Sequence, residues 1–191
     1  DLFWITNPAY FFNMQSFRYT QDTIDAELKK SKEDFILHFR SAYTDDYPPA
    51  WMIAEILPLG LLCRIYTNLK GNVIKKRVAQ HFGLQVPVFS SWIVILAGLR
   101  NMCCHHCRTW NRELATITTE PRRTKYGWID SSRTDKRRMY YRICMIRYFL
   151  YTVSPNNNFK DKLKTLLAAY PNIDTAAMGF PSDWESEDIW K

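Results

Sequence analysis

The sequence lacks the features that would place it in a membrane or an oxidising compartment. Its longest uninterrupted apolar run, 92–99, has eight residues, whereas a helix that spans a bilayer needs about 20, so no membrane span is expected. The five cysteines are an odd number, and three of them fall within five positions, unlike the disulfide framework of a secreted scaffold. No basic and apolar leader is visible at the start. We therefore expect a cytoplasmic protein.

Glycine is also scarce, with six in 191 residues, while apolar residues make up 47% of the chain and aromatic residues 15%. This composition excludes a disordered chain and suffices for one well-buried domain over 1–191. Apolar residues recur at helical intervals, and convincing two-residue alternation is not found. The sequence therefore predicts an all-α fold with an irregular C-terminal tail.

Helical spacing places the individual elements. The predicted helices are 23–40, 50–57, 61–69, 73–82, 90–108, 131–153 and 159–170. Asp22 is the expected N-cap of the helix over 23–40, and Asn158 is that of the helix over 159–170. Gly83 is expected to end the helix over 73–82. In 131–153, arginines are expected outside a buried stripe formed by Met139, Ile143, Ile146, Leu150 and Val153. The segment 114–130, with a proline, a glycine and four threonines, is the best loop.

Positive charge is concentrated in one stretch of the chain. The net charge is +7, and residues 108–147 hold eleven Lys and Arg against four Asp and Glu, while the remainder is balanced. Such a cluster predicts binding to a polyanion, and a solvated cationic face is the alternative. The candidate RNA contacts are Arg108, Arg122, Arg123, Lys136, Arg137 and Arg138.

The helix predicted over 90–108 changes abruptly from apolar to polar at Arg100. A guanidinium buried there would need a partner or a cleft. Arginine grips phosphate oxygens, and histidine moves protons near neutral pH. Cleavage of RNA by its own 2′-hydroxyl, with His105 as general acid or base and no metal, would need these groups. On a helix the two side chains share a face only loosely, so a cleft or a second helix would have to bring them together. The alternative is a polar network that satisfies a helix end.

The same stretch carries a family resemblance. Residues 100–112 read RNMCCHHCRTWNR, which resembles the RN-x-x-A-HH-x-R-x-WNR signature of the Abi-like (AbiD/AbiF) abortive-infection family. Further segments agree in order, namely SKEDF at 31–35 with His38, PPAW at 48–51 with Glu55, LG at 59–60, YTNL at 66–69, and MGFP at 178–181 with Trp184. One departure is Cys104, where the family commonly has alanine.

The resemblance implies a HEPN-like helical bundle and a role as a toxin in bacterial antiphage defence. It implies a metal-independent endoribonuclease without a cofactor, whose catalytic residues are Arg100, Asn101, His105 and His106. Proteins of this type place two such motifs face to face, so a homodimer acting on RNA is implied, and a neutralising RNA or protein is a further expected partner. Family members usually carry another helical N-terminal region, which this chain is expected to lack.

Other residues near the motif have supporting or alternative interpretations. Glu55 could pair with Arg100 and hold its rotamer, and a helix-end salt bridge elsewhere is the alternative. Trp110, Asn111 and Arg112 are expected to cap the helix and brace the site. One alternative function is a catalytically inactive module that binds RNA or a partner. Another is a zinc-stabilised domain, because residues 104–107 contain a CxxC, but the second ligand pair of a structural zinc site is missing. We expect no metal.

Overall fold

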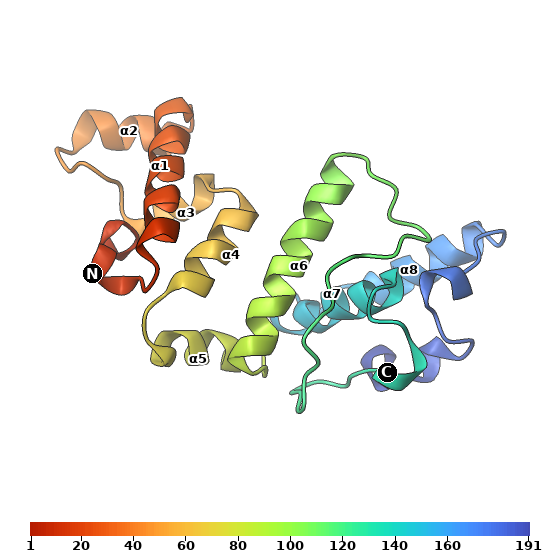
Figure 1. The fold of residues 1–191 in the computed structure, drawn as a ribbon. Coiled ribbons are helices and arrows are strands. Elements are labelled where there is room, and N and C mark those ends of the chain that lie inside the picture. Colours follow the sequence, from red (N-terminus) through yellow and green to blue (C-terminus); the bar gives the residue numbers. More distant parts are fainter. The chain divides into compact units, whose positions relative to one another are not determined.

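The computed structural model describes residues 1–191 and contains eight α-helices and no β-strand (Figure 1). This confirms the all-α prediction. The helices are α1 (Met14–Lys30), α2 (Asp34–Ala42), α3 (Ala50–Ile56), α4 (Leu59–Asn68), α5 (Asn72–His81), α6 (Val86–Cys104), α7 (Met139–Val153) and α8 (Phe159–Ala169). The chain forms two compact units, Asp1–Lys75 and Lys76–Lys191, and the division falls within α5. That 1–191 behaves as a single domain stays a prediction.

The N-terminal unit begins with two helices where the sequence predicted one over 23–40. The first starts earlier because the Asn13 side chain caps it, accepting a hydrogen bond from the Ser16 N–H at 2.8 Å. It ends at Ser31, whose backbone is extended and whose hydroxyl accepts from the Glu33 N–H at 3.3 Å. Asp22, the expected N-cap, therefore lies inside α1.

Helices α1, α3 and α4 pack around the core of this unit. Ile24, Ile36 and Ile53, from three different helices, are completely buried in it. The break between α3 and α4 occurs at Pro58 as predicted, although α4 resumes at Leu59 rather than at residue 61. The end of α4 is tied to the start of α1, because the Asn68 side chain forms two hydrogen bonds with the Asn13 backbone, at 2.9 and 3.0 Å.

Helix α6 is the long apolar helix of the C-terminal unit. Gly83, with φ +66°, closes the turn after α5 as expected, and Pro87 occupies the first turn of α6. By length and composition α6 could cross a membrane, and 33% of its most apolar window is buried in this structure. The eight-residue apolar run did not predict this, but one such helix is weak evidence, because the core helix of a bundle has the same composition.

Helix α7 is shorter than the predicted 131–153. Residues Ser131–Arg133 form only a short 3-10 turn, and the α-helix begins at Met139. Two aspartates favour turns in between, because Asp130 Oδ1 accepts from the Ser132 N–H at 3.0 Å and Asp135 Oδ1 accepts from the N–H of residue 137 at 2.8 Å. Such local side-chain bonds compete with helix formation.

The stripe predicted for α7 is buried at Met139 and Ile143, but the expectation that arginines lie away from the buried part of the helix is wrong. Arg142 is completely buried and Arg147 is 8% exposed, whereas Val153 is 64% exposed. The Arg142 guanidinium donates to the carbonyl of Thr116, and burial lowers the pKa of this arginine. The predicted loop 114–130 is irregular in the structure and lies against Arg142. Arg147 instead donates to Asn157 and to the Tyr151 hydroxyl.

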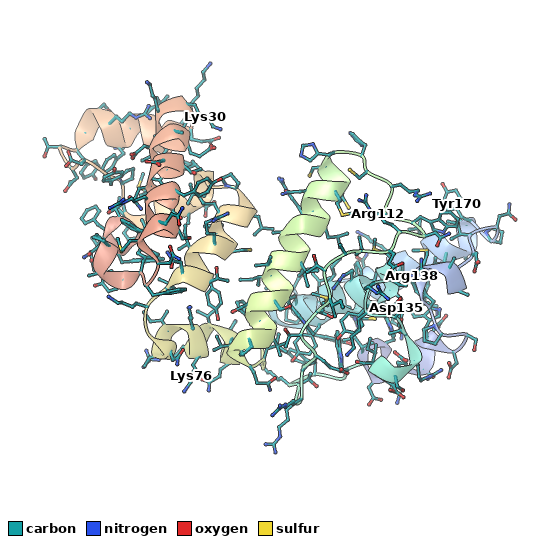
Figure 2. All side chains as sticks on the ribbon, viewed as in Figure 1. Lys30, Lys76, Arg112, Asp135, Arg138 and Tyr170 are labelled. Carbon is teal, nitrogen blue, oxygen red and sulfur yellow. The ribbon has the colours of Figure 1, made fainter.

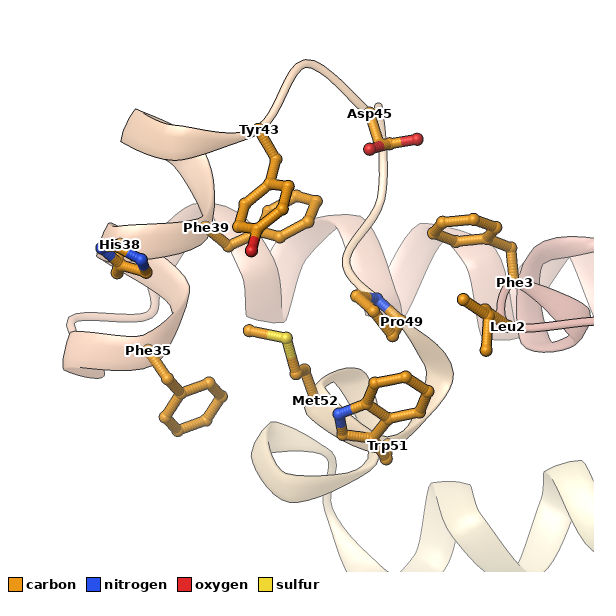
Figure 3. A pocket seen from close by; sticks show the side chains of 10 residues that line it. All are labelled: Leu2, Phe3, Phe35, His38, Phe39, Tyr43, Asp45, Pro49, Trp51 and Met52. Atoms are coloured by element: carbon orange, nitrogen blue, oxygen red, sulfur yellow. The ribbon is translucent and has the colours of Figure 1, made fainter.

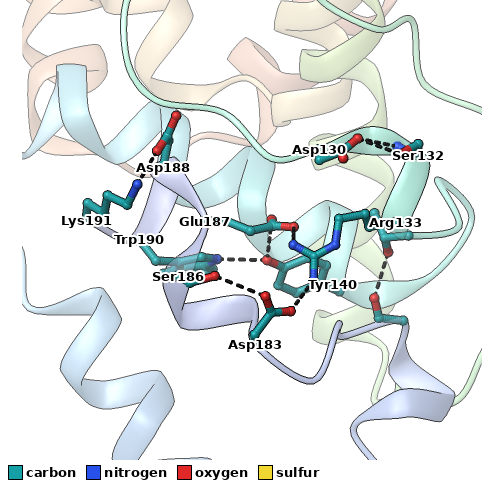
Figure 4. A network of polar contacts seen from close by, with 12 residues as sticks. Asp130, Ser132, Arg133, Tyr140, Asp183, Ser186, Glu187, Asp188, Trp190 and Lys191 are labelled. Carbon is teal, nitrogen blue, oxygen red and sulfur yellow. Dashed lines mark hydrogen bonds and ion pairs between the residues drawn. The ribbon is translucent and has the colours of Figure 1, made fainter.

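The tail after α8 is irregular, as predicted, and is held by a buried polar network (Figure 4). Trp190 is completely buried, and its indole N–H donates to the Tyr140 hydroxyl at 3.0 Å, which donates in turn to Glu187 at 2.9 Å. Arg133 pairs with Glu187 and with Asp183. Burial raises the pKa of Glu187.

The N-cap of α8 is Asn158, as predicted, but the capping hydrogen bond comes from the preceding residue. Asn158 occupies the cap position without a side-chain hydrogen bond. The side chain that bonds to the helix start is that of Asn157, whose Oδ1 accepts from the Phe159 N–H at 3.0 Å.

Candidate functional site

The Arg/His motif lies at the C-terminal end of α6, where the helix stops four residues before the predicted residue 108. The Cys107 N–H donates to the Met102 carbonyl at 2.9 Å, and the His106 N–H donates to the Cys103 carbonyl at 3.1 Å. These two bonds form the Schellman motif that ends many helices. The motif residues are therefore divided between the last helical turn and the turn that follows it.

Arg100 and Asn101 are on the last turns of the helix, and both side chains are exposed. The Arg100 Nη1 donates to Asn101 Oδ1 at 3.4 Å, and the guanidinium makes no ion pair. The expectation that a buried guanidinium would need a partner therefore does not apply, because the helix end is open to solvent. Asn101 also contacts the start of the turn, because its backbone carbonyl accepts a hydrogen bond from the His105 N–H at 3.0 Å.

The two histidines differ in backbone conformation. His105 is the C-cap residue, with φ −93°. His106 has φ +52°, in the left-handed region, where a Schellman motif usually has glycine. A side chain in this region costs about 1 kcal/mol or more. Both imidazoles are exposed and neither has a side-chain hydrogen bond.

The expected supporting residues follow at the next turn of the chain, and Figure 2 labels Arg112 among them. Asn111 also has a left-handed backbone, φ +45°, and its Oδ1 accepts from Arg138 Nη1 at 3.1 Å. Trp110 is 39% exposed and Arg112 is exposed without an ion pair. Glu55 is an exposed residue of α3 in the N-terminal unit, so its pairing with Arg100 stays a prediction.

The candidate RNA contacts fall into two groups of three. Lys136 pairs with Glu120, Arg137 pairs with Glu113 at 2.5 Å, and Arg138 holds Asn111. These three tie the chain before α7 to the loop after α6. The other three are exposed and make no ion pair: Arg108, Arg122 and Arg123. The C-terminal unit as a whole has 18 Lys and Arg against 10 Asp and Glu.

Comparison with known families decides the relationship. The Abi-like protein family matches residues 1–111, which end just after the two histidines. This chain belongs to the Abi-like family. Membership associates the protein with abortive infection. No curated protein and no solved structure matches the chain significantly.

No metal centre is assembled in this Abi-like protein. No group of three or more His, Cys, Asp or Glu side chains is arranged to hold a metal ion. The three cysteines beside the histidines are exposed, whereas the two others are buried. The exposed thiols are those of Cys103, Cys104 and Cys107.

The structure has two surface hollows that the motif residues do not line. One hollow lies along α8, between Asn158 and Ala169, and the other is formed by residues between Leu2 and Met52 of the N-terminal unit. The second hollow was not predicted from the sequence. The segments 31–35 and 48–51 carry the family resemblance, but their spacing in the sequence does not show that they meet in space.

Proposed function

We propose that this protein is a metal-independent endoribonuclease of the HEPN type that acts as a toxin in abortive infection, in the cytoplasm and as a homodimer. The observation that carries the proposal is the open end of α6, where Arg100, Asn101, His105 and His106 lie within seven residues and no carboxylate neutralises the arginine. A guanidinium free of ion pairs is available to a phosphate.

The proposed chemistry needs only these side chains and the RNA. The guanidinium of Arg100 binds the non-bridging oxygens of the scissile phosphate. One imidazole takes the proton of the 2′-hydroxyl, the 2′-oxygen bonds to phosphorus, and the bond from phosphorus to the 5′-oxygen breaks. A second imidazole gives a proton to the leaving 5′-oxygen. The products are a 2′,3′-cyclic phosphate and a 5′-hydroxyl.

A second copy of the chain would supply what one copy lacks. The motif ends an exposed helix, and it borders neither the hollow along α8 nor the hollow of the N-terminal unit. In-line transfer requires an acid and a base on opposite sides of the phosphate. Two α6 ends related by a twofold axis would place one set of side chains on each side.

We propose that the RNA binds through the arginines that make no ion pair rather than through all six candidate residues. Arg108, Arg122 and Arg123 make no ion pair, whereas Lys136 and Arg137 are already paired with carboxylates. Phosphate binding at paired residues would have to displace an existing partner. The three free arginines are therefore expected to account for most of the salt dependence.

A catalytically inactive module that binds RNA or a protein partner is the second candidate. The exposure of the motif supports it, because general acid–base chemistry normally takes place in a site shielded from water. This module would bind RNA with salt-dependent affinity and leave it intact.

Incubation of the protein with RNA, with and without EDTA, separates these functions. We expect cleavage in both conditions and its loss in the double variant Arg100→Ala, His105→Ala. The matched control is Arg77→Ala, His81→Ala, which removes the same exposed residue types from α5, outside the motif. Cleavage that persists in the Arg100/His105 variant refutes the nuclease.

Two further results with the same protein and chelator would favour the alternative functions. Salt-sensitive binding of intact RNA by the wild-type protein would favour the inactive module. Loss of helical signal on chelation would favour a zinc-stabilised domain.

A further inference from the structure

The unpredicted hollow of the N-terminal unit is a second candidate site (Figure 3). Its volume is about 470 Å³, within the range of about 300–1,000 Å³ that holds small ligands. The walls are mainly aromatic and apolar, with Phe35 and Phe39 from α2 and Trp51 and Met52 from α3.

Local contacts fix the shape of this hollow. The rings of Phe39 and Tyr43 are stacked, with centroids 5.3 Å apart and 12° between their planes. The N–H of Ala50 donates to the Leu2 carbonyl at 2.8 Å, which holds the start of the chain against α3. Residues far apart in the sequence are thereby brought to one place.

Large apolar side chains around the hollow remain in contact with solvent. Trp51 and Tyr43 are each 58% exposed, and Leu2 is 55% exposed. A single exposed apolar residue is ordinary, but several around one concave surface indicate a binding site. The aromatic rings also offer the faces that attract a cation.

The charge around the hollow favours a positive ligand. Asp45 is the one carboxylate in the lining, Asp46 follows it in the same loop, and no Lys or Arg lines the hollow. The other ionisable groups in the lining are His38, at the opposite edge in Figure 3, and Tyr43. The N-terminal unit has 8 Lys and Arg against 9 Asp and Glu. A nucleic acid would meet this carboxylate without a cation to bind its phosphates.

We infer that this hollow binds an organic cation with an apolar or aromatic body, through the aromatic walls and the carboxylate of Asp45. The same chemistry is available from a free amine and from a lysine beside an aromatic side chain in a peptide. The inference is independent of RNA cleavage, because it uses different residues in a different unit of the chain.

Titration of the full chain with three probes of similar size tests the inference. The probes are 2-phenylethylammonium, neutral 2-phenylethanol and the anion phenylacetate, and the readout is the NMR signal of the Trp51 indole N–H. We expect the cation to bind about three- to fivefold more tightly than the alcohol, from its attraction to one carboxylate and the ring faces. The anion should bind most weakly. Equal affinities, or no shift with any probe, overturn the inference.

Two variants assign the effect to residues. Asp45→Asn should abolish the preference for the cation while keeping the binding of the alcohol. Asp46→Asn is the matched control, because it removes a neighbouring carboxylate that does not line the hollow. An unchanged preference in Asp45→Asn contradicts the assignment. Trp51 is exposed, so Trp51→Ala should keep the fold and weaken the binding of all three probes. Because this variant lacks the indole signal, its binding is measured from the NMR signals of the ligands in competition.

A second pair of ligands separates the sources of the cation. Acetyl-Phe-Lys-amide presents the cation from a peptide, and single-stranded RNA presents a polyanion with stackable bases. Tighter binding of the peptide than of the free amine supports a protein partner, and the reverse order supports a small amine. RNA that competes with the amine at Trp51 would overturn the inference in favour of a nucleic-acid surface.

Discussion

Replacing each histidine of the motif by glycine should change stability in opposite directions. At His106, where φ is +52°, glycine relieves a left-handed strain of about 1 kcal/mol. It also loses about 0.5 kcal/mol because glycine is more flexible in the unfolded chain. The net expectation for His106→Gly is a gain of about 0.5 kcal/mol. At His105, with φ −93°, there is no strain to relieve, so His105→Gly should lose about 0.5 kcal/mol.

Urea unfolding followed by circular dichroism measures this difference of about 1 kcal/mol. Side-chain contacts contribute little to it, because neither imidazole has a hydrogen bond. Both variants remove a proposed proton-transfer group and should cleave RNA poorly. A variant that is more stable than wild type but less active would show that the strained residue is retained for function. Equal shifts of the same sign at both positions would refute the reasoning.

Three other outcomes follow from the structure. Gly98→Ala should stabilise α6 by about 0.5–1 kcal/mol, because an added Cβ meets nothing within 4 Å. Gly83→Ala should destabilise the protein, because its Cβ would lie 2.1 Å from that of Lys125. Thermal unfolding of the two variants compares these effects. Burial raises the pKa of Glu187, so wild-type stability should fall as pH rises through that pKa, and Glu187→Gln, compared by denaturation between pH 4 and 7, should remove this fall. Alkylation followed by mass spectrometry should label three cysteines in the native protein and all five in urea; more than three native adducts would contradict the assigned burial.

Periodicity predicted most helices but not the end of α6. The short helices α3, α5 and α8 lie within a few residues of their predicted ranges because prolines, glycines or caps mark their ends. At α6 the polar residues continue the helical pattern, but the chain turns at His106 because a left-handed residue starts the Schellman motif. Nothing in a single sequence marks a histidine for that conformation.

Long-range contacts explain the larger differences. Arg142 is buried because the loop after α6 lies against it. The spacing of apolar residues in α7 does not indicate that contact. The hollow of the N-terminal unit likewise joins residues as distant as Leu2 and Trp51. The Arg/His motif can be recognised in the sequence because its residues are contiguous, whereas no local pattern encodes the second copy that is proposed to complete it.

The most direct test of RNA cleavage at the end of α6 uses the chemistry of the RNA itself. An RNA and the same strand with 2′-deoxyribose throughout are incubated with the wild-type protein and EDTA, and the ends of the products are identified by mass spectrometry. We predict 2′,3′-cyclic phosphate ends from the RNA and no cleavage of the deoxy strand. Neither strand should be cleaved by the Arg100→Ala, His105→Ala variant. Cleavage of the deoxy strand, or cyclic ends produced equally by that variant, would contradict the account.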